Sequence, residues 1–226
     1  DMILDVRQLS YDLEDGTALF KDVTFTVNKG DKIAFVSKDG LVISNFFKVL
    51  AGESKAKKGE INFGVTITKS YVPNDNSAYF KNADLNLVDW LRQFSAEKDE
   101  TFIRGFLGRM LFSGEESLKK CTVLSGGEKV RCMMSKTMLE EANFLILDEP
   151  TNHLDLESIT SLNNGLIDYA GTILFTSHDH TFTQTIANRI IEITPNGMLD
   201  KMMSYDDYLA DPKVKEQRAE LYGTLV

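Results

Sequence analysis

The sequence predicts an α/β fold in which an antiparallel β region comes first, a helical region is inserted next, and a mostly parallel core sheet is completed last. Three observations support this. Apolar and polar residues alternate near the N-terminus, as in strands that bury one face. Between about residues 84 and 120, apolar residues recur at steps of three and four, as in amphipathic helices. From residue 125 onward, helical and strand patterns alternate, which is typical of a parallel sheet with helices on both faces.

The first two strands are expected in "MILDVRQLSY" (2–11) and "LFKDVTFTV" (19–27), with a turn at "EDGT" between them. A buried strand, "KIAFV" (32–36), then leads through a polar turn into a helix, "SNFFKVLAG" (44–52), which Gly52 is expected to end. Two more short strands are expected in "GEINFG" (59–64) and "VTITKSYVP" (65–73). Residues 33–52 therefore form a strand-turn-helix unit, the arrangement in which phosphate-binding loops occur.

Helical periodicity dominates the middle of the chain, in "LNLVDWLRQF" (85–94), "TFIRGFLGRML" (101–111) and "SGGEKVRCMMSKTMLEEA" (125–142), and we assign about 84–140 to a helical subdomain. Strands "FLILD", "TILFTS" and "RIIEIT" then alternate with helices "LESITSLNNGLIDY" and "HTFTQTIAN". The tail, about 204–226, is charged, helix-prone and interrupted by Pro212. We expect a single domain over 1–226.

Composition excludes several classes of protein. The 226 residues are 42% hydrophobic, and no apolar run approaches the roughly 20 residues that span a bilayer, so we expect a cytoplasmic protein. The formal charge of -9 disfavours general nucleic-acid binding, which needs a basic face. Cys121 and Cys132 lack metal-site spacing and are expected to be reduced thiols without chemistry.

Two acidic residues end the strand "FLILDE", where a parallel sheet presents its ligands. There, Asp148 can hold magnesium through water, and Glu149 can orient or deprotonate an attacking water. Apolar strands ending in acidic residues are also common without such a role.

The stretch "LSGGEK" opens a long helix. Ser125 suits a helix cap, and Gly126 and Gly127 let backbone N–H groups approach an anion, although such a stretch is more often only a cap. His178, after the strand "TILFTS", can donate a hydrogen bond to a phosphate. His153 and His180 are better explained as loop or cap residues.

Taken together, "LSGGE", "LDEPTNHLD" and "SHDH" resemble the nucleotide-binding domain of the ABC ATPases, and "LSGGEKVRCMMSKTMLEEANFLILDEPTNHLD" is similar to the ABC-F subfamily. Members of that subfamily are soluble, carry two ATPase domains on one chain and often act on translation at the ribosome. The resemblance covers nearly the whole chain. The chain lacks an initiator Met and resembles an excised second domain of such a tandem.

The resemblance implies ATP and Mg²⁺ as cofactors and gives residues their roles. It makes Glu149 the general base, His178 the γ-phosphate switch, and Asp148 a magnesium ligand. Asn74 stands where the family usually has Gln, next to the magnesium, and its shorter side chain reaches less far. Tyr11 corresponds to the aromatic residue that stacks on adenine, although core packing explains it equally well.

The remaining roles that the resemblance implies face a partner domain. Ser125, Gly126 and Gly127 form the signature that contacts the ATP of that domain, and Asp155 lies in the loop between domains.

The phosphate loop of the family, GxxGxGK[ST], departs from its pattern here. It falls on Ser37, Gly40, Val42, Ile43 and Ser44, followed by Asn45, and only Gly40 and Ser44 match. Val42 replaces a glycine that lets the backbone approach phosphate, and Ile43 replaces the lysine that neutralises it. Ser44 retains a hydroxyl that can reach magnesium. We therefore expect this loop to bind ATP weakly and to hydrolyse it poorly.

Three functions are compatible with these residues. The leading one is an ATPase domain of an ABC-F translation factor that works with the first nucleotide-binding domain of the same protein. Its contacts with the ribosome and its RNA are expected mainly through parts absent from this chain, without a stable membrane subunit. The alternatives are an ATP-binding subunit of a membrane transporter and a non-hydrolysing dimerisation module whose altered loop serves as packing.

Overall fold

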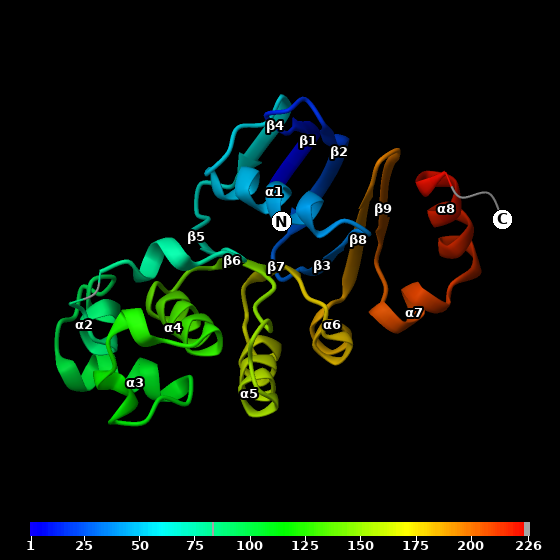
Figure 1. Cartoon of the computed structure of the whole chain (residues 1–226). Helices are drawn as coiled ribbons and strands as arrows, with labels where there is room; N and C mark the ends of the chain where they lie inside the picture. The colour runs from blue at the N-terminus through cyan, green and yellow to red at the C-terminus, as the bar shows by residue number, and fades with distance from the viewer. Residues whose placement is uncertain (83, 224–226) are drawn as a thin grey trace.

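The fold has two sheets and a set of helices that separate and cover them (Figure 1). The structure is a computed structural model that describes residues 1–82 and 84–223. The smaller sheet has the strand order β2-β1-β4, formed by β1 (Met2–Asp12), β2 (Ala18–Asn28) and β4 (Lys58–Phe63). Both pairings are antiparallel, as the alternating pattern at the N-terminus predicts.

The larger sheet has the order β5-β6-β7-β3-β8-β9. Its strands are β3 (Lys32–Val36), β5 (Lys69–Val72), β6 (Phe144–Asp148), β7 (Thr172–Thr176), β8 (Arg189–Thr194) and β9 (Gly197–Lys201). All neighbours pair in parallel except β8 and β9. The mostly parallel core sheet predicted from the sequence is therefore confirmed, with an antiparallel strand at one edge.

Helix α1 (Gly40–Ala51) lies between the two sheets and packs its apolar side chains against both, in one core that also holds Phe35 and Phe144. The opposite face of the larger sheet is covered by α4 (Gly126–Leu139), α5 (Leu156–Ile167) and α6 (His180–Ile186) in a second core. Successive residues of each central strand point into different cores, which explains why these strands are apolar throughout.

The inserted helical region contains α2 (Leu87–Arg92) and α3 (Glu100–Arg109), which pack with α4. Single turns of 3₁₀ helix occur at Ser77–Phe80, Glu116–Leu118 and Cys121–Val123. Buried Trp90 stacks on Phe80 with ring centroids 4.8 Å apart, and its indole N–H donates to the Tyr79 carbonyl over 2.7 Å. The insertion is therefore tied to the segment that follows β5.

The tail folds into α7 (Tyr205–Ala210) and α8 (Pro212–Tyr222), and Figure 1 shows α8 beside β9, away from the helical insertion. Pro212 is the first residue of α8, where a missing N–H costs no helical hydrogen bond. The last residues of the predicted tail, 224–226, lie outside the described residues.

Three details differ from the sequence-based expectations. The edge strand β9 was not predicted, although "TPNG" between it and β8 has turn composition. Residues 65–68 form a turn rather than a strand, since Ile67 N–H donates to the Gly64 carbonyl and Val65 is exposed. Helix α1 begins at Gly40, before the predicted start at Ser44.

Among residues 1–82 and 84–223, no helix combines the length and apolar character needed to cross a membrane. Cys121 and Cys132 are free and buried, and burial raises the pKa of both thiols. Neither cysteine therefore has the low thiol pKa of a reactive site.

Candidate functional site

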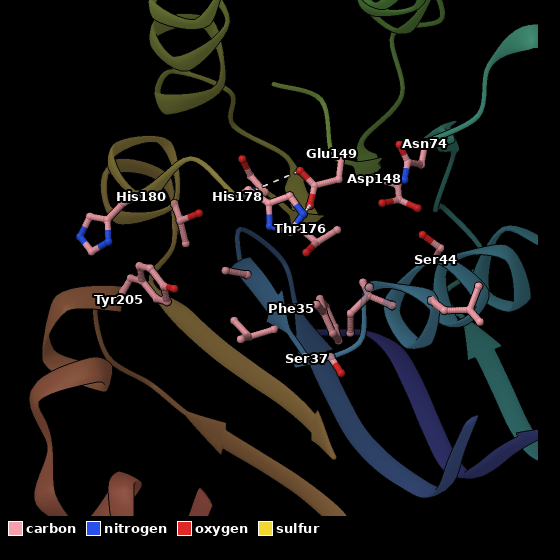
Figure 2. A pocket seen from close by; sticks show the side chains of 17 residues that line it. Phe35, Ser37, Ser44, Asn74, Asp148, Glu149, Thr176, His178, His180 and Tyr205 are labelled. Carbon is pink, nitrogen blue, oxygen red and sulfur yellow. Dashed lines mark hydrogen bonds and ion pairs between the residues drawn. The ribbon is translucent and has the colours of Figure 1, made fainter. Parts of the chain in front are cut away.

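A cavity of about 450 Å³ lies at the carboxyl ends of β3, β6 and β7. Parallel strands bring these ends together, so residues far apart in the sequence line one space (Figure 2). Of the residues predicted from sequence, the following line it: Ser37, Gly40, Ile43, Ser44, Asn74, Asp148, Glu149 and His178. The cavity is therefore where the predicted nucleotide residues converge.

The phosphate loop is short. Only residues 37–39 separate β3 from α1, and Asp39 caps the helix by accepting a hydrogen bond from the Leu41 N–H over 3.0 Å. The helix N-terminus carries a partial positive charge that attracts anions. Here the acidic side chain of Asp39 already satisfies one amide at that position.

Two predicted loop residues do not line the cavity. Val42 is buried in the core between the sheets. Asn45 is also buried, and its side-chain amide donates to the Leu41 carbonyl over 2.8 Å. Ile43 does line the cavity, but its side chain is only 2% exposed and belongs to the same core as Phe46 and Phe47. Val42 and Ile43, the positions at which the family glycine and lysine are expected, are thus part of the hydrophobic packing.

Asp148 ends β6, and the residue is 2% exposed. Burial raises the pKa of this carboxyl, an effect that a hydrogen bond with the Ser44 side chain partly offsets. Its Oδ2 has no hydrogen-bond partner among the described residues. Figure 2 places Asp148 between Ser44 and Asn74. An unpartnered buried carboxylate oxygen beside a hydroxyl and an amide fits the oxygen ligands that Mg²⁺ prefers.

Glu149 and His178 face each other across the ends of β6 and β7 (Figure 2). Glu149 Oε1 lies 3.1 Å from His178 Nε2, and Oε2 accepts a hydrogen bond from the His178 N–H over 3.2 Å. Burial raises the pKa of the Glu149 carboxyl. The His178 side chain is 87% exposed, so the imidazole contacts both the glutamate and solvent.

The backbone at Glu149 has a positive φ of 54°, which is unusual for a residue with a side chain. Its N–H donates to the Thr176 carbonyl at the end of β7 over 2.9 Å. That bond holds the left-handed turn and orients the Glu149 carboxylate toward the cavity. Strained backbone of this kind is found at functional sites.

The SGG stretch packs against the loop after β6. Ser125 accepts a hydrogen bond from the Glu128 N–H, and the Glu128 side chain accepts one from the Ser125 N–H, which makes a complete capping box. A Cβ on Gly127 would stand 2.5 Å from the His153 carbonyl oxygen, and one on Gly126 would meet the His153 ring at 3.0 Å. Close packing against backbone thus requires glycine at position 127, whereas at position 126 a small shift of the His153 side chain would be needed.

Asp155 caps α5 by accepting a hydrogen bond from the Ser158 N–H over 2.8 Å, and hydrogen bonding from Ser158 lowers the pKa of its carboxyl. A smaller cavity of about 240 Å³ is lined by Gly126 and His153 together with Asn74, Asp148 and Glu149. The SGG stretch therefore borders the same acidic centre, from the other side.

Tyr11 lies apart from these residues. It is half-buried on β1, stacks on Phe20 with ring centroids 5.8 Å apart, and does not line the cavity. Its position matches the packing explanation, and adenine stacking stays a prediction.

Comparison with known proteins shows the family of this chain. A family model described as "ABC transporter" matches residues 20–152. The chain is a member of the ABC ATPase family. It is 61% identical over 210 residues to the ABC transporter ATP-binding protein YkpA of Bacillus subtilis. That match covers 92% of this chain and 39% of YkpA. The chain is also 33% identical over 227 residues to ABC transporter F family member 5 of Arabidopsis thaliana. That match covers 97% of this chain and 32% of the plant protein.

The ABC fold is also seen in a solved structure. The ATP-binding cassette MJ0796, in a dimeric state after hydrolysis with ADP and Pi bound, superimposes with a TM-score of 0.75 at 14% identity, covering 89% of this chain and 99% of that one. At that identity the likeness concerns the fold alone. The chain spans well under half the length of the F-type relatives named above.

Several residues of this ABC site were missed by sequence reasoning. Thr176, Ser177, Thr183, His180 and Tyr205 also line the cavity. His180 begins α6 directly after the N-cap Asp179, close to the loop or cap role expected of it. Beyond that role, its Nε2 lies 2.6 Å from Asp206 Oδ1 and its ring tilts against Tyr205. In the sequence, His180 stands in "SHDH" and its contacts Tyr205 and Asp206 stand much later, in "YDDY". Nothing in the sequence shows that α6 and α7 meet.

The charge of the site is unusual for a phosphate-binding cavity. Its described lining contains Asp148 and Glu149 but neither lysine nor arginine. Exposed Lys48, one turn after Ser44, lines the adjoining space and lowers the pKa of Asp148. Exposed Lys38 lies in the turn itself but does not line the cavity. With Ile43 in the lining instead of a lysine, the backbone amides and these two lysines are the groups that could attract phosphate.

Proposed function

We propose that this chain is the second ATP-binding domain of a cytoplasmic tandem ABC-F protein that binds the ribosome and acts on translation, and that its own phosphate loop is degenerate. The observation that carries the proposal is Ile43. This apolar side chain is 2% exposed at the start of α1, where the family loop has its lysine. We infer weak binding of ATP here and poor hydrolysis.

The remaining site residues support a reduced ATPase chemistry. Ser44, Asp148 and Asn74 would hold Mg²⁺, which when bound neutralises phosphate charge. Glu149 would accept a proton from an attacking water. Burial raises the pKa of its carboxyl, and a carboxylate with a raised pKa is a stronger base. The hydrogen bond from the His178 N–H keeps that carboxylate oriented, and the exposed His178 ring, whose Nε2 lies 3.1 Å from Glu149 Oε1, would turn from that contact to meet a terminal phosphate.

The domain's main contribution is then to its partner. Ser125, Gly126, Gly127 and Asp155 lie at the starts of α4 and α5, near the acidic centre. We infer that this surface completes an ATP site on the first nucleotide-binding domain of the same protein. Ribosome and RNA contacts are assigned mainly to parts outside this chain, and no stable membrane subunit is expected.

A second candidate function is a dimerisation module that holds no nucleotide. It is favoured by the same packing of Ile43, because a loop that serves the core has no need of ATP. A role as the ATP-binding subunit of a membrane transporter has no specific observation in its favour beyond the shared family.

Calorimetric titration of the purified chain with Mg-ATP separates these functions. We expect binding in the millimolar range, tightened about 10- to 200-fold in the double variant Val42→Gly, Ile43→Lys, because one charged hydrogen bond is restored. The matched control Val42→Gly, Ile43→Met carries the same glycine without the charge and should bind no more tightly than the unaltered chain.

Two results would contradict the weak-site proposal. Micromolar binding by the unaltered chain would show that the loop needs no lysine. No binding by the unaltered chain, with binding by the lysine variant, would favour the dimerisation module. Circular dichroism of each variant establishes that it is folded before its titration is interpreted.

A further inference from the structure

The C-terminal helix α8 reaches the phosphate loop. The Tyr222 hydroxyl accepts a hydrogen bond from the Lys38 N–H over 3.4 Å, and the Lys38 ammonium lies 4.2 Å from the centroid of the Tyr222 ring. Lys38 is the middle residue of the three that join β3 to α1. One aromatic side chain therefore contacts both the backbone and the side chain of that turn, although neither residue lines the cavity.

A buried carboxylate fixes the position of Tyr222. Glu192, on β8 beside β3, is 0% exposed. Its Oε2 accepts from the Tyr222 hydroxyl over 2.5 Å, while Oε1 accepts from the Tyr208 hydroxyl over 2.6 Å and from Arg218 Nε over 2.7 Å. All three donors come from α7 and α8. A buried carboxylate is costly without such partners, so Glu192 holds the tail in one place.

The hydroxyl of Tyr222 thus joins two elements. It donates to Glu192 on the central sheet and accepts from Lys38 in the loop. Other contacts hold the helix around it: Asn196 donates to the Leu221 carbonyl over 2.9 Å, and Val214 is buried in the core. Tyr222 is therefore rigidly placed where it limits the movement of the turn.

We propose that Tyr222 is a positioning residue for the phosphate loop, and that docking of α8 through Glu192 sets how well the loop amides bind phosphate. This inference rests on the proposed function, because it concerns the same loop. It follows from the absence of a lysine at position 43: where phosphate is bound mainly by amides, affinity depends on how well the geometry of those amides is held before binding.

The test compares two substitutions of equal size. Tyr222→Phe removes the hydroxyl and keeps the ring over Lys38. The control, Tyr169→Phe, removes another partly buried hydrogen bond, which the Tyr169 hydroxyl donates to the Ala142 carbonyl over 2.5 Å. This bond lies at a place without contact to the loop. Hydrogen exchange without nucleotide is measured at the Leu41 and Val42 amides, which bond to Asp39 and not to Tyr222.

We expect exchange at Leu41 and Val42 to rise about 2- to 10-fold in Tyr222→Phe, the range of one ordinary hydrogen bond, and to stay unchanged in Tyr169→Phe. The dissociation constant for Mg-ATP should rise by a similar factor. Tyr222→Leu, which also removes the ring, should enlarge both effects.

Unchanged exchange at both amides in Tyr222→Phe would overturn the proposal, and so would faster exchange without any change in ATP affinity. If the unaltered chain binds no Mg-ATP, the proposed weak site fails, and the exchange rates alone then decide whether Tyr222 positions the loop. The two failures are therefore distinguishable.

Discussion

Asp148 combines deep burial with an oxygen that lacks a partner among the described residues, and such a group lowers the stability of a fold. Its pKa is raised from the ordinary value of 3.8. The folded state therefore retains a proton to higher pH than the unfolded state, and stability falls as pH rises through that interval. Above it, the full cost of the ionised carboxylate is present.

We expect Asp148→Asn to stabilise the chain at pH 7 by roughly 1–3 kcal/mol, the usual cost of an unsatisfied buried group, and to bring no gain well below pH 3.8, where the carboxyl is protonated in both states. Urea unfolding from pH 8 down to about pH 2 measures this. The control is Asp75→Asn, because hydrogen bonds from Ser77 lower the pKa of Asp75 and no gain is expected. Equal stability of Asp148→Asn and the unaltered chain at pH 7 would contradict the argument.

Gly127 gives a second prediction at this scale. Gly127→Ala should destabilise the chain by about 1–3 kcal/mol, because the added Cβ would stand 2.5 Å from the His153 carbonyl. Gly165→Ala, inside α5 with nothing within 4 Å, should instead stabilise by about 0.5–1 kcal/mol. Thermal melts of the two variants compare them, and a shift of the same sign in both would count against the packing explanation.

The site residues show what sequence can and cannot predict. Motif spacing found Asp148, Glu149, His178 and the glycines of the signature, since each follows a recognisable strand or opens a helix. Motif spacing did not predict that His180 lines the cavity or that Tyr222 contacts the loop, because their positions depend on how α6, α7 and α8 pack. It also missed Asp39, whose capping bond forms only because α1 starts early.

At the scale of elements, strands with an obvious apolar pattern and helices with clear caps were predictable. The turn at 65–68 was not, because its β-branched residues have strand propensity while tertiary contacts decide their conformation. Asn143, distant in sequence, donates to the Thr66 carbonyl over 2.9 Å and accepts from the Thr68 N–H over 2.9 Å. Strand β9 was not predicted because few of its residues are buried, so its apolar pattern is weak. Its partner β8 is buried along its whole length and gives no sign in the sequence of a further strand beside it.

The capping box of α4 allows a prediction for that element. Ser125→Ala removes a side-chain acceptor and should cost about 0.5–2 kcal/mol, whereas Ser125→Asp keeps a good cap and should cost little. Urea unfolding measures both. If Ser125→Asp keeps stability but lowers ATP turnover in a longer tandem protein, Ser125 has a role beyond capping. Equal loss of stability in both variants would argue against capping.

At the scale of the whole molecule, Arg189 joins the two sheets. Its guanidinium binds Asp200 in a bidentate pair at 2.8 and 2.6 Å, reaches Asp31 at 3.1 Å, and donates to the Thr26 carbonyl of β2 over 2.8 Å. The side chain is almost fully buried, and Asp200 and Asp31 raise the pKa of the guanidinium against the opposing effect of burial. This single side chain therefore bonds to both sheets.

We expect Arg189→Met to destabilise the chain by about 3–5 kcal/mol, because two carboxylates lose their partner. Lys58→Met breaks the exposed pair with Asp22 and should cost less than about 1 kcal/mol. Chemical unfolding distinguishes the two, and similar losses would mean that Arg189 does not connect the sheets energetically.

The burial of Val42 and Ile43 has a consequence for the history of the loop. Both side chains share a core with Phe35 and Phe46, so a lysine at position 43 would give up packed apolar surface to send its ammonium group into the cavity that Ile43 also lines. Returning to glycine at position 42 leaves a void in the same core. Each of these two substitutions is therefore expected to lower the stability of this chain. Descendants of this sequence are therefore expected to drift further from the lysine-bearing loop rather than to regain it.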